Sequence, residues 1–425
     1  MDGAEEAPAQ RVGPLQQGGP AQRVGLAAIA RGWGWIGSIG FGGPPAHIAL
    51  LRRLCVERRG WLSAAEFEDG VAATSLLPGP ASTQLAIFTA WRLRGVPGAL
   101  VGGAAFIAPG LVLILALAAV FLSDNPPRWV LGAAAGAGAA VAAVAVHAAA
   151  ALIPAGLQRA GEGSAGEGLV GGGRAGRVRW AGHLLAGGAA AVLAGPWTVL
   201  VIVAAGLLET AVRTRPAQRQ PQPRPQPDAR PVRWRARFLP PAVAAPAGGG
   251  LLALAWVAFK VGALSYGGGF VIIPLMQSDA VDRYHWMTDS RFLDAVALGQ
   301  ITPGPVVHTV AAVGYAAAGV PGGLLAAAVA FGPSFLFVIA GGPHFDRLRT
   351  DARVRAFLTG AGPAAVGAIA GSAVPLALAL QHPWQYGVLA VAAVWLLIAR
   401  QGVVSALLGA GVLGVGAALL GLPVA

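Results

Sequence analysis

The chain has 425 residues, of which 56% are hydrophobic and only 11% are charged, and its formal net charge is +12. Soluble globular domains carry about 25% charged residues. The composition therefore excludes a water-soluble enzyme, a disordered scaffold and a nucleic-acid-binding protein, and it predicts that most of the chain lies in lipid. Cys55 is the only cysteine, so we expect no disulfide within the chain and no cysteine metal site.

The apolar segments predict ten membrane-spanning helices. A hydrocarbon core about 30 Å thick needs roughly 20 helical residues. We expect spans at 24–43, 97–122, 128–153, 181–195, 196–212, 249–272, 321–342, 356–380, 384–399 and 402–423.

Polar segments divide these spans into two membrane repeats, 24–212 and 238–425. Residues 1–23 form a polar tail without the apolar core of a secretory signal peptide. Residues 213–237 hold eight Arg and six Pro, a composition typical of an extended linker. Its positive charge predicts a cytoplasmic location.

Two further segments, 62–91 and 287–318, carry Pro-Gly-Pro near the middle. Proline blocks a continuous helix, so each segment is expected to be a broken span or a re-entrant helical hairpin. Arginines stand on both sides of the first segment and place both of its ends in the cytoplasm, which favours re-entry. The second segment has acidic residues before it and an uncharged turn after it, so both ends are expected outside. The fold class predicted is an all-α polytopic membrane protein with ten spans, two hairpins and both termini outside.

The two halves are related by an internal repeat. At an offset of 225, residues 37–80 align with 262–305 without a gap, and fifteen of the 44 positions are identical. Two halves of five spans each must run in opposite directions. Inverted repeats with broken helices are frequent in secondary transporters, whose sites lie near the midplane at the repeat interface. A duplicated structural membrane protein without transport activity is the alternative.

Three motifs recur in the two halves. In the first half they are Phe41-Gly42-Gly43-Pro44, Leu76-Leu77-Pro78-Gly79-Pro80 with Gln84, and Gly95-Val96-Pro97-Gly98; in the second half they are Tyr266-Gly267-Gly268-Gly269, Thr302-Pro303-Gly304-Pro305 and Gly319-Val320-Pro321-Gly322. These motifs resemble those of the chromate ion transporter (CHR) family, in its long two-domain form. The resemblance implies export of chromate across the cytoplasmic membrane, with sulfate as a related or competing anion and coupling to the proton-motive force. The second half departs from the first motif, because Gly269 replaces a proline.

A tetrahedral dianion in lipid needs fixed hydrogen-bond donors and positive potential. A half-helix that starts after each Pro-Gly-Pro would point its N-terminal amides at the hairpin tip, and the glycine runs would let backbone amides approach an anion. The substrate-binding candidates are Gly42, Gly43, Pro78, Gly79, Pro80, Ser82, Thr83, Gln84, Lys260, Gly267, Gly268, Pro303, Gly304, Pro305, His308 and Thr309. The alternatives are a tight structural turn at the tips and close helix packing at the glycine runs.

Few ionisable residues fall within the apolar segments, which makes each a functional candidate. Lys260 lies midway along its span and is expected to attract the anion, whereas Arg31 stands nearer a span end. Asp69 and Asp294 occupy equivalent places in the two hairpins and, with His308, are candidates for proton coupling. A helix cap or a salt bridge is an equally good interpretation of the two aspartates.

No cofactor, metal or nucleic acid is expected. The predicted partners are the oxyanion and the bilayer. The sequence leaves open whether the chain forms a homo-oligomer. Two other functions also remain open, transport of another anion and a membrane enzyme acting on a lipid phosphate. The enzyme requires a nucleophile or metal cluster at the membrane face, and the sequence shows no zinc-site spacing.

Overall fold

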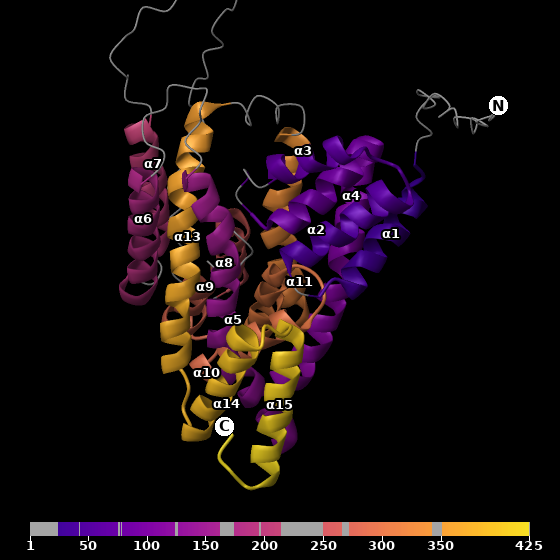
Figure 1. The fold of residues 1–425 in the computed structure, drawn as a ribbon. Helices are drawn as coiled ribbons and strands as arrows, with labels where there is room; N and C mark the ends of the chain where they lie inside the picture. The colour runs from indigo at the N-terminus through magenta and orange to yellow at the C-terminus, as the bar shows by residue number, and fades with distance from the viewer. Residues whose placement is uncertain are drawn as a thin grey trace, which may run out of the picture.

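A computed structural model describes residues 24–41, 43–74, 77, 79–123, 126–161, 174–194, 197–213, 250–265, 272–341 and 351–424. This part of the chain is helical throughout (Figure 1). Four helices are long and apolar enough to cross a membrane: Ala81–Phe121, Arg128–Gln158, Val306–Gly341 and Ala352–Leu378. The predicted all-α membrane protein is confirmed at this level.

The helices of the first half are α1 (Leu26–Ile39), α2 (Pro44–Arg52), the π-helix η1 (Arg53–Arg58), α3 (Ala64–Thr74), α4 (Ala81–Phe121), α5 (Arg128–Gly161), α6 (Arg174–Leu193) and α7 (Thr198–Arg213). Those of the second half are α8 (Leu251–Leu264), α9 (Ile273–Gln277), the π-helix η4 (Ser278–Arg283), α10 (Asp289–Ile301), the 3₁₀ turn η5 (Val306–His308), α11 (Thr309–Gly341), α13 (Ala352–Leu378), α14 (Pro383–Ala393), the π-helix η7 (Val394–Ile398) and α15 (Val403–Leu419).

Several helices of the second half share one or both bounds with first-half helices, displaced by the repeat offset of 225 residues. Helix α8 has the bounds of α1 displaced by the repeat offset, and η4 stands in the same relation to η1. Helix α10 begins at the position equivalent to the start of α3. Helix α13 begins at the equivalent of the start of α5, once the single deletion in the alignment is taken into account.

The described helices differ from the predicted elements in three ways. Helices α1 and α8, expected as the spans 24–43 and 249–272, have 14 residues each and are shorter than the roughly 20 residues that a crossing needs. Residues 44–58, for which the sequence predicts no element, form α2 and η1. The spans expected to begin at 97 and 321 are the second parts of longer helices, kinked at Arg94 and Gly95 and at Ala318 and Gly319. Helical hydrogen bonding resumes directly after each kink, so no loop separates the half-helix from the span.

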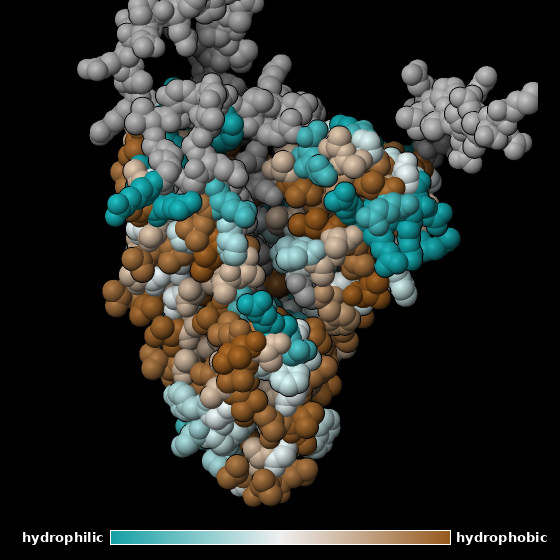
Figure 2. Space-filling model, in the orientation of Figure 1, coloured by the Kyte–Doolittle hydropathy of each residue, from teal (hydrophilic) through white to brown (hydrophobic). Residues whose placement is uncertain are grey.

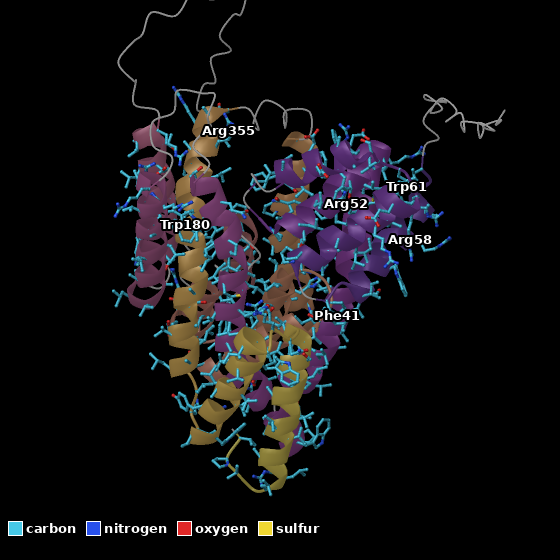
Figure 3. All side chains as sticks on the ribbon, in the orientation of Figure 1. Phe41, Arg52, Arg58, Trp61, Trp180 and Arg355 are labelled. Carbon is cyan, nitrogen blue, oxygen red and sulfur yellow. The ribbon has the colours of Figure 1, made fainter. Side chains whose placement is uncertain are left out.

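Apolar side chains cover much of the visible flank (Figure 2). Leu193, Ile398 and Leu420 are 83%, 75% and 82% exposed, an arrangement that is favourable in lipid and costly in water. Hydrophilic side chains gather at the upper right of this view, where Figure 3 labels Arg52 and Arg58. The described helices therefore form a membrane-spanning bundle.

Helix α13 packs against α6 and α7 (Figure 1). Its contact with α6 is a close approach of two backbones, because a Cβ atom on Gly367 would overlap the carbonyl oxygen of Leu184. Gly362 lies on the same helix with no heavy atom within 4 Å of an added Cβ. Small residues are the usual means by which membrane helices gain van der Waals contact.

We expect Gly367→Leu to separate α6 from α13 and to lower the thermal unfolding midpoint in detergent by several degrees. Overpacking a tight contact costs about 1–3 kcal/mol. The matched control is Gly362→Leu, expected to unfold within about a degree of the parent protein. Equal midpoints for the two variants in a fluorescence-detected melt would contradict this packing.

Candidate functional site

Gly79 and Pro80 of the first Pro-Gly-Pro motif and all three residues of the second are buried, and a helix follows each motif directly. Gly79 and Gly304 adopt φ angles of +124° and +100°, a region that favours glycine. Helix α4 begins after Pro80 and η5 begins after Pro305, and neither proline has a side chain that can cap the helix. The N–H groups of each first turn are therefore left to other acceptors, at the positive end of the helix dipole.

The helices on either side of the first turn, α3 and α4, contact each other. Glu66, near the start of α3, forms an ion pair with Arg92 of α4, with 3.1 Å between the guanidinium nitrogen and the carboxylate oxygen. Beyond the kink, α4 packs back along its own first segment, since a Cβ atom on Gly103 would lie 2.8 Å from Ile87. The start of α3 therefore lies beside the kink of α4.

The second turn packs against α4 near the middle of its crossing. A Cβ atom on Gly110 would overlap the Pro303 carbonyl oxygen and lie 2.6 Å from Cε1 of His308. With a rise of 1.5 Å per residue, Gly110 is about 22 Å beyond the kink and about 16 Å before the end of α4. The second tip is thus held near mid-depth by a helix of the first half.

The first turn packs in the same way on α11. A Cβ atom on Gly79 would lie 3.4 Å from the Ser334 hydroxyl oxygen. Ser334 is the repeat equivalent of Gly110, since both directly follow the paired prolines Pro333 and Pro109. Each tip therefore faces the equivalent position on the long helix of the other half.

Several buried polar atoms around this crossing have no hydrogen-bond partner among the described residues. They are Oγ1 of Thr83, Oγ of Ser265 and Ser334, Nδ1 of His47 and both ring nitrogens of His308. The Ile107 carbonyl lies beside the His308 ring but in poor geometry for a hydrogen bond. A buried polar group without a partner costs about 1–3 kcal/mol, so a concentration of such groups indicates a binding site.

The loop after α1 connects the halves through one carbonyl oxygen. Gly40 accepts hydrogen bonds from the Gly304 backbone N–H (2.9 Å) and from Nε2 of His47 (2.8 Å). Because a carbonyl only accepts, Nε2 carries the proton and Nδ1 of His47 is the basic nitrogen. The Phe106 ring packs edge-on against His47, with 5.1 Å between centroids.

Ser334 and His47 are the residues that the sequence analysis does not select. A signal for Ser334 exists in the repeat, because Pro333 before it pairs with the Pro109 that precedes Gly110. His47 has no such signal. It faces the site because α2 folds back beside α4.

The other binding candidates fall into four groups. Ser82, Thr83 and Gln84 are buried in the first turn of α4, beside Gly79 and Pro80. Thr309 is buried, and its hydroxyl donates to the Val306 carbonyl of its own turn (2.8 Å). Gly43 precedes α2 with a φ of +74° and is partly exposed. Gly42, Pro78, Gly267 and Gly268 lie outside the described residues.

Lys260 is engaged by other groups. Its ammonium forms a close ion pair with Asp279 of η4 and lies 5.9 Å from the centroid of the Trp256 ring. The carboxylate of Asp279 therefore balances the positive charge of Lys260. Arg31 is exposed on α1. Among the described residues, the donors at the tips are therefore neutral side chains and backbone amides.

The two equivalent aspartates differ in environment. Asp69 is exposed on α3, whereas Asp294 of α10 is only 7% exposed and lines a small pocket. No group of three or more His, Cys, Asp or Glu side chains suited to a metal ion occurs in the described part of the chain.

Comparison with known proteins places the chain in a family. The family model described as "Chromate transporter" matches residues 27–210 and 252–415. The chain is 32% identical over 351 residues to the "Chromate transport protein" of Cupriavidus metallidurans, covering 80% of each chain.

Two further relatives carry similar descriptions. Identity is 30% with the "Chromate transport protein" of Pseudomonas aeruginosa, over 80% of this chain and 78% of the relative. It is 28% with the "Probable chromate transport protein" of Synechococcus elongatus, over 80% of this chain and 82% of the relative. No solved structure matches. The protein is a transporter rather than an enzyme, and it belongs to the chromate transporter family.

Proposed function

We propose that the protein exports chromate across the cytoplasmic membrane, with sulfate as a related or competing anion, and that the proton-motive force drives export. The observation that carries this proposal is the set of buried, unpartnered polar groups around two uncapped helix starts near mid-depth. The relatives described as chromate transport proteins support chromate as the substrate.

We further propose that the two halves have inverted topology. Two contacts support this arrangement. Arg92 meets Glu66 where the first hairpin begins, before α4 makes its crossing. Arg291, near the start of α10, donates to the carbonyl of Ser123 at the far end of α4 (3.4 Å). The hairpins thus begin at opposite ends of the same crossing helix.

Chromate and sulfate are dianions that accept hydrogen bonds and donate none. Two helix N-termini provide partial positive charge, and the Thr83 and Ser334 hydroxyls provide neutral donors. A site of this kind binds an anion without a buried lysine or arginine, so it can also release the anion on either side. His308, next to Gly110 and the second tip, and His47, bonded to the Gly40 carbonyl, are ionisable groups at this site.

Movement of one half against the other would expose this site alternately to the two sides, as in other inverted-repeat transporters. The contacts that join the halves at the tips include the hydrogen bond from Gly304 to Gly40. These contacts are compatible with rigid-body rocking of one half against the other, because each tip packs on a helix of the opposite half.

We expect inverted membrane vesicles that contain the protein to accumulate labelled chromate above empty vesicles when the interior is acidified. Collapse of the pH gradient should reduce accumulation at least tenfold, and excess sulfate should compete. Accumulation equal to that of empty vesicles would exclude chromate export.

We expect Thr83→Val and Ser334→Ala each to weaken chromate binding about tenfold or more. A hydrogen bond to a charged group contributes about 1.5–3 kcal/mol. The matched control is Thr89→Val on α4, because the buried Thr89 hydroxyl already donates to the Leu85 carbonyl at 2.8 Å. Binding can be measured as the chromate concentration for half-maximal exchange in proteoliposomes. Equal values for all three variants would remove the two hydroxyls from the site.

Topology can be tested with single cysteines in a background where Cys55 is replaced by alanine. We expect Ser63→Cys and Arg92→Cys to react with an impermeant maleimide only from the cytoplasmic side, because both stand at the entrance of the first hairpin. Asp282→Cys should react only from outside. Labelling of Ser63→Cys and Arg92→Cys from opposite sides would make the first hairpin a plain span.

A further inference from the structure

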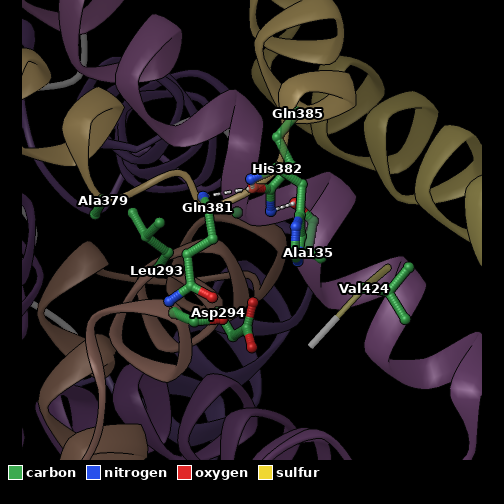
Figure 4. A pocket seen from close by; sticks show the side chains of 10 residues that line it. Ala135, Leu293, Asp294, Ala379, Gln381, His382, Gln385 and Val424 are labelled. Atoms are coloured by element: carbon green, nitrogen blue, oxygen red, sulfur yellow. Dashed lines mark hydrogen bonds between the residues drawn. The ribbon is translucent and has the colours of Figure 1, made fainter. Parts of the chain in front are cut away.

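A small pocket lies where α10, α5, the turn between α13 and α14 and the C-terminal segment meet. Its lining consists of Ala135, Gly138, Ser290, Leu293, Asp294, Ala379, Gln381, His382, Gln385 and Val424 (Figure 4). The pocket has room for about one water molecule. It is much too small for a tetrahedral oxyanion, so it does not belong to the substrate site.

Asp294 is the unusual member of this lining. It is more than nine-tenths buried, yet its carboxylate makes no hydrogen bond and no ion pair with the residues that the structure describes. A buried carboxylate normally has several such partners, because desolvating its charge is expensive. Protonation removes that charge and so removes most of the cost.

The surroundings of Asp294 contain little that would hold it ionised. Arg291, one turn earlier on α10, interacts with its charge at a distance, and the Arg291 side chain is engaged with the Ser123 carbonyl. His382 is the other ionisable residue of the pocket lining. Gly138 of α5 lies directly against the carboxylate, and α15 has no ionisable residue.

One polar residue of the lining reaches the surface of the protein. Gln381 is exposed at the turn, and its side chain reaches toward Asp294 (Figure 4). Gln385 fixes that turn by accepting hydrogen bonds from the backbone N–H groups of Gln381 and His382, both at 2.9 Å. This turn ends α13, a helix of 27 residues and about 40 Å whose other end carries Arg353 and Arg355. Since arginines mark the cytoplasmic side, the pocket faces outward.

We infer that Asp294 is the site where the driving proton enters from the external side, through the pocket formed with Gln381 and Gln385. The inference rests on the proposed proton-coupled export and names the residue that carries it. A proton from external water binds one carboxylate oxygen, and the neutral acid releases it to the cytoplasmic side after the halves have moved. Asp69, the equivalent residue of the first half, is exposed and has no such enclosure.

The test compares two activities in proteoliposomes. Exchange of labelled for unlabelled chromate at equal pH needs no net proton movement, whereas accumulation against a gradient needs it. We expect Asp294→Asn to keep exchange within about twofold of the parent protein and to lose at least tenfold of pH-driven accumulation. Asp282→Asn, an exposed carboxylate nearby in the chain, is the control and should keep both.

The possible results separate clearly. Undiminished pH-driven accumulation by Asp294→Asn, or loss of exchange and accumulation to the same extent, would overturn the inference. If Asp294→Asn does not fold, Gln381→Leu decides, because an apolar side chain at the entrance should slow accumulation severalfold without slowing exchange. Unchanged accumulation by that variant would also overturn it. Absence of exchange in the parent protein would instead contradict the proposed function.

Discussion

Unpaired backbone amides cannot face hydrocarbon, and this requirement shapes the whole molecule. Each N–H group left unsatisfied in the membrane costs several kcal/mol. The turns at Gly79 and Gly304 interrupt helices near mid-depth and expose such groups. They are possible because each is covered by the long helix of the opposite half, at Ser334 for the first turn and at Gly110 for the second. The halves are therefore obligatory partners, and the place where they cover one another is also where we propose that the anion binds.

Much of this architecture follows from the sequence. Mean hydropathy and span length predict a helical membrane protein, and the repeat offset anticipates that α8 has the bounds of α1 displaced along the chain. The buried position of Thr83 and His308 follows from helix periodicity after a proline turn. These features are local, since they depend on composition and on the dihedral preferences of a few residues.

The rest depends on tertiary contacts that no local pattern encodes. Ser334 faces the first tip only because α11 crosses beside it, and Lys260 is balanced by Asp279 through the fold of η4. Neither the helices over 44–58 nor the continuity of α4 through its kink could be predicted from the sequence.

Several equivalent positions at the proposed site carry different chemistry in the two halves. Thr83 corresponds to His308, and Gly110 corresponds to Ser334. An exposed aspartate in one hairpin corresponds to a buried one in the other. A duplicated fold supplies two similar tips for one symmetric dianion, so the first copy need not repeat every task of the second. Under the proposed mechanism, divergence at these few sites would let one half handle the proton while both halves hold the anion, because coupling requires only that the same rocking motion moves both ligands.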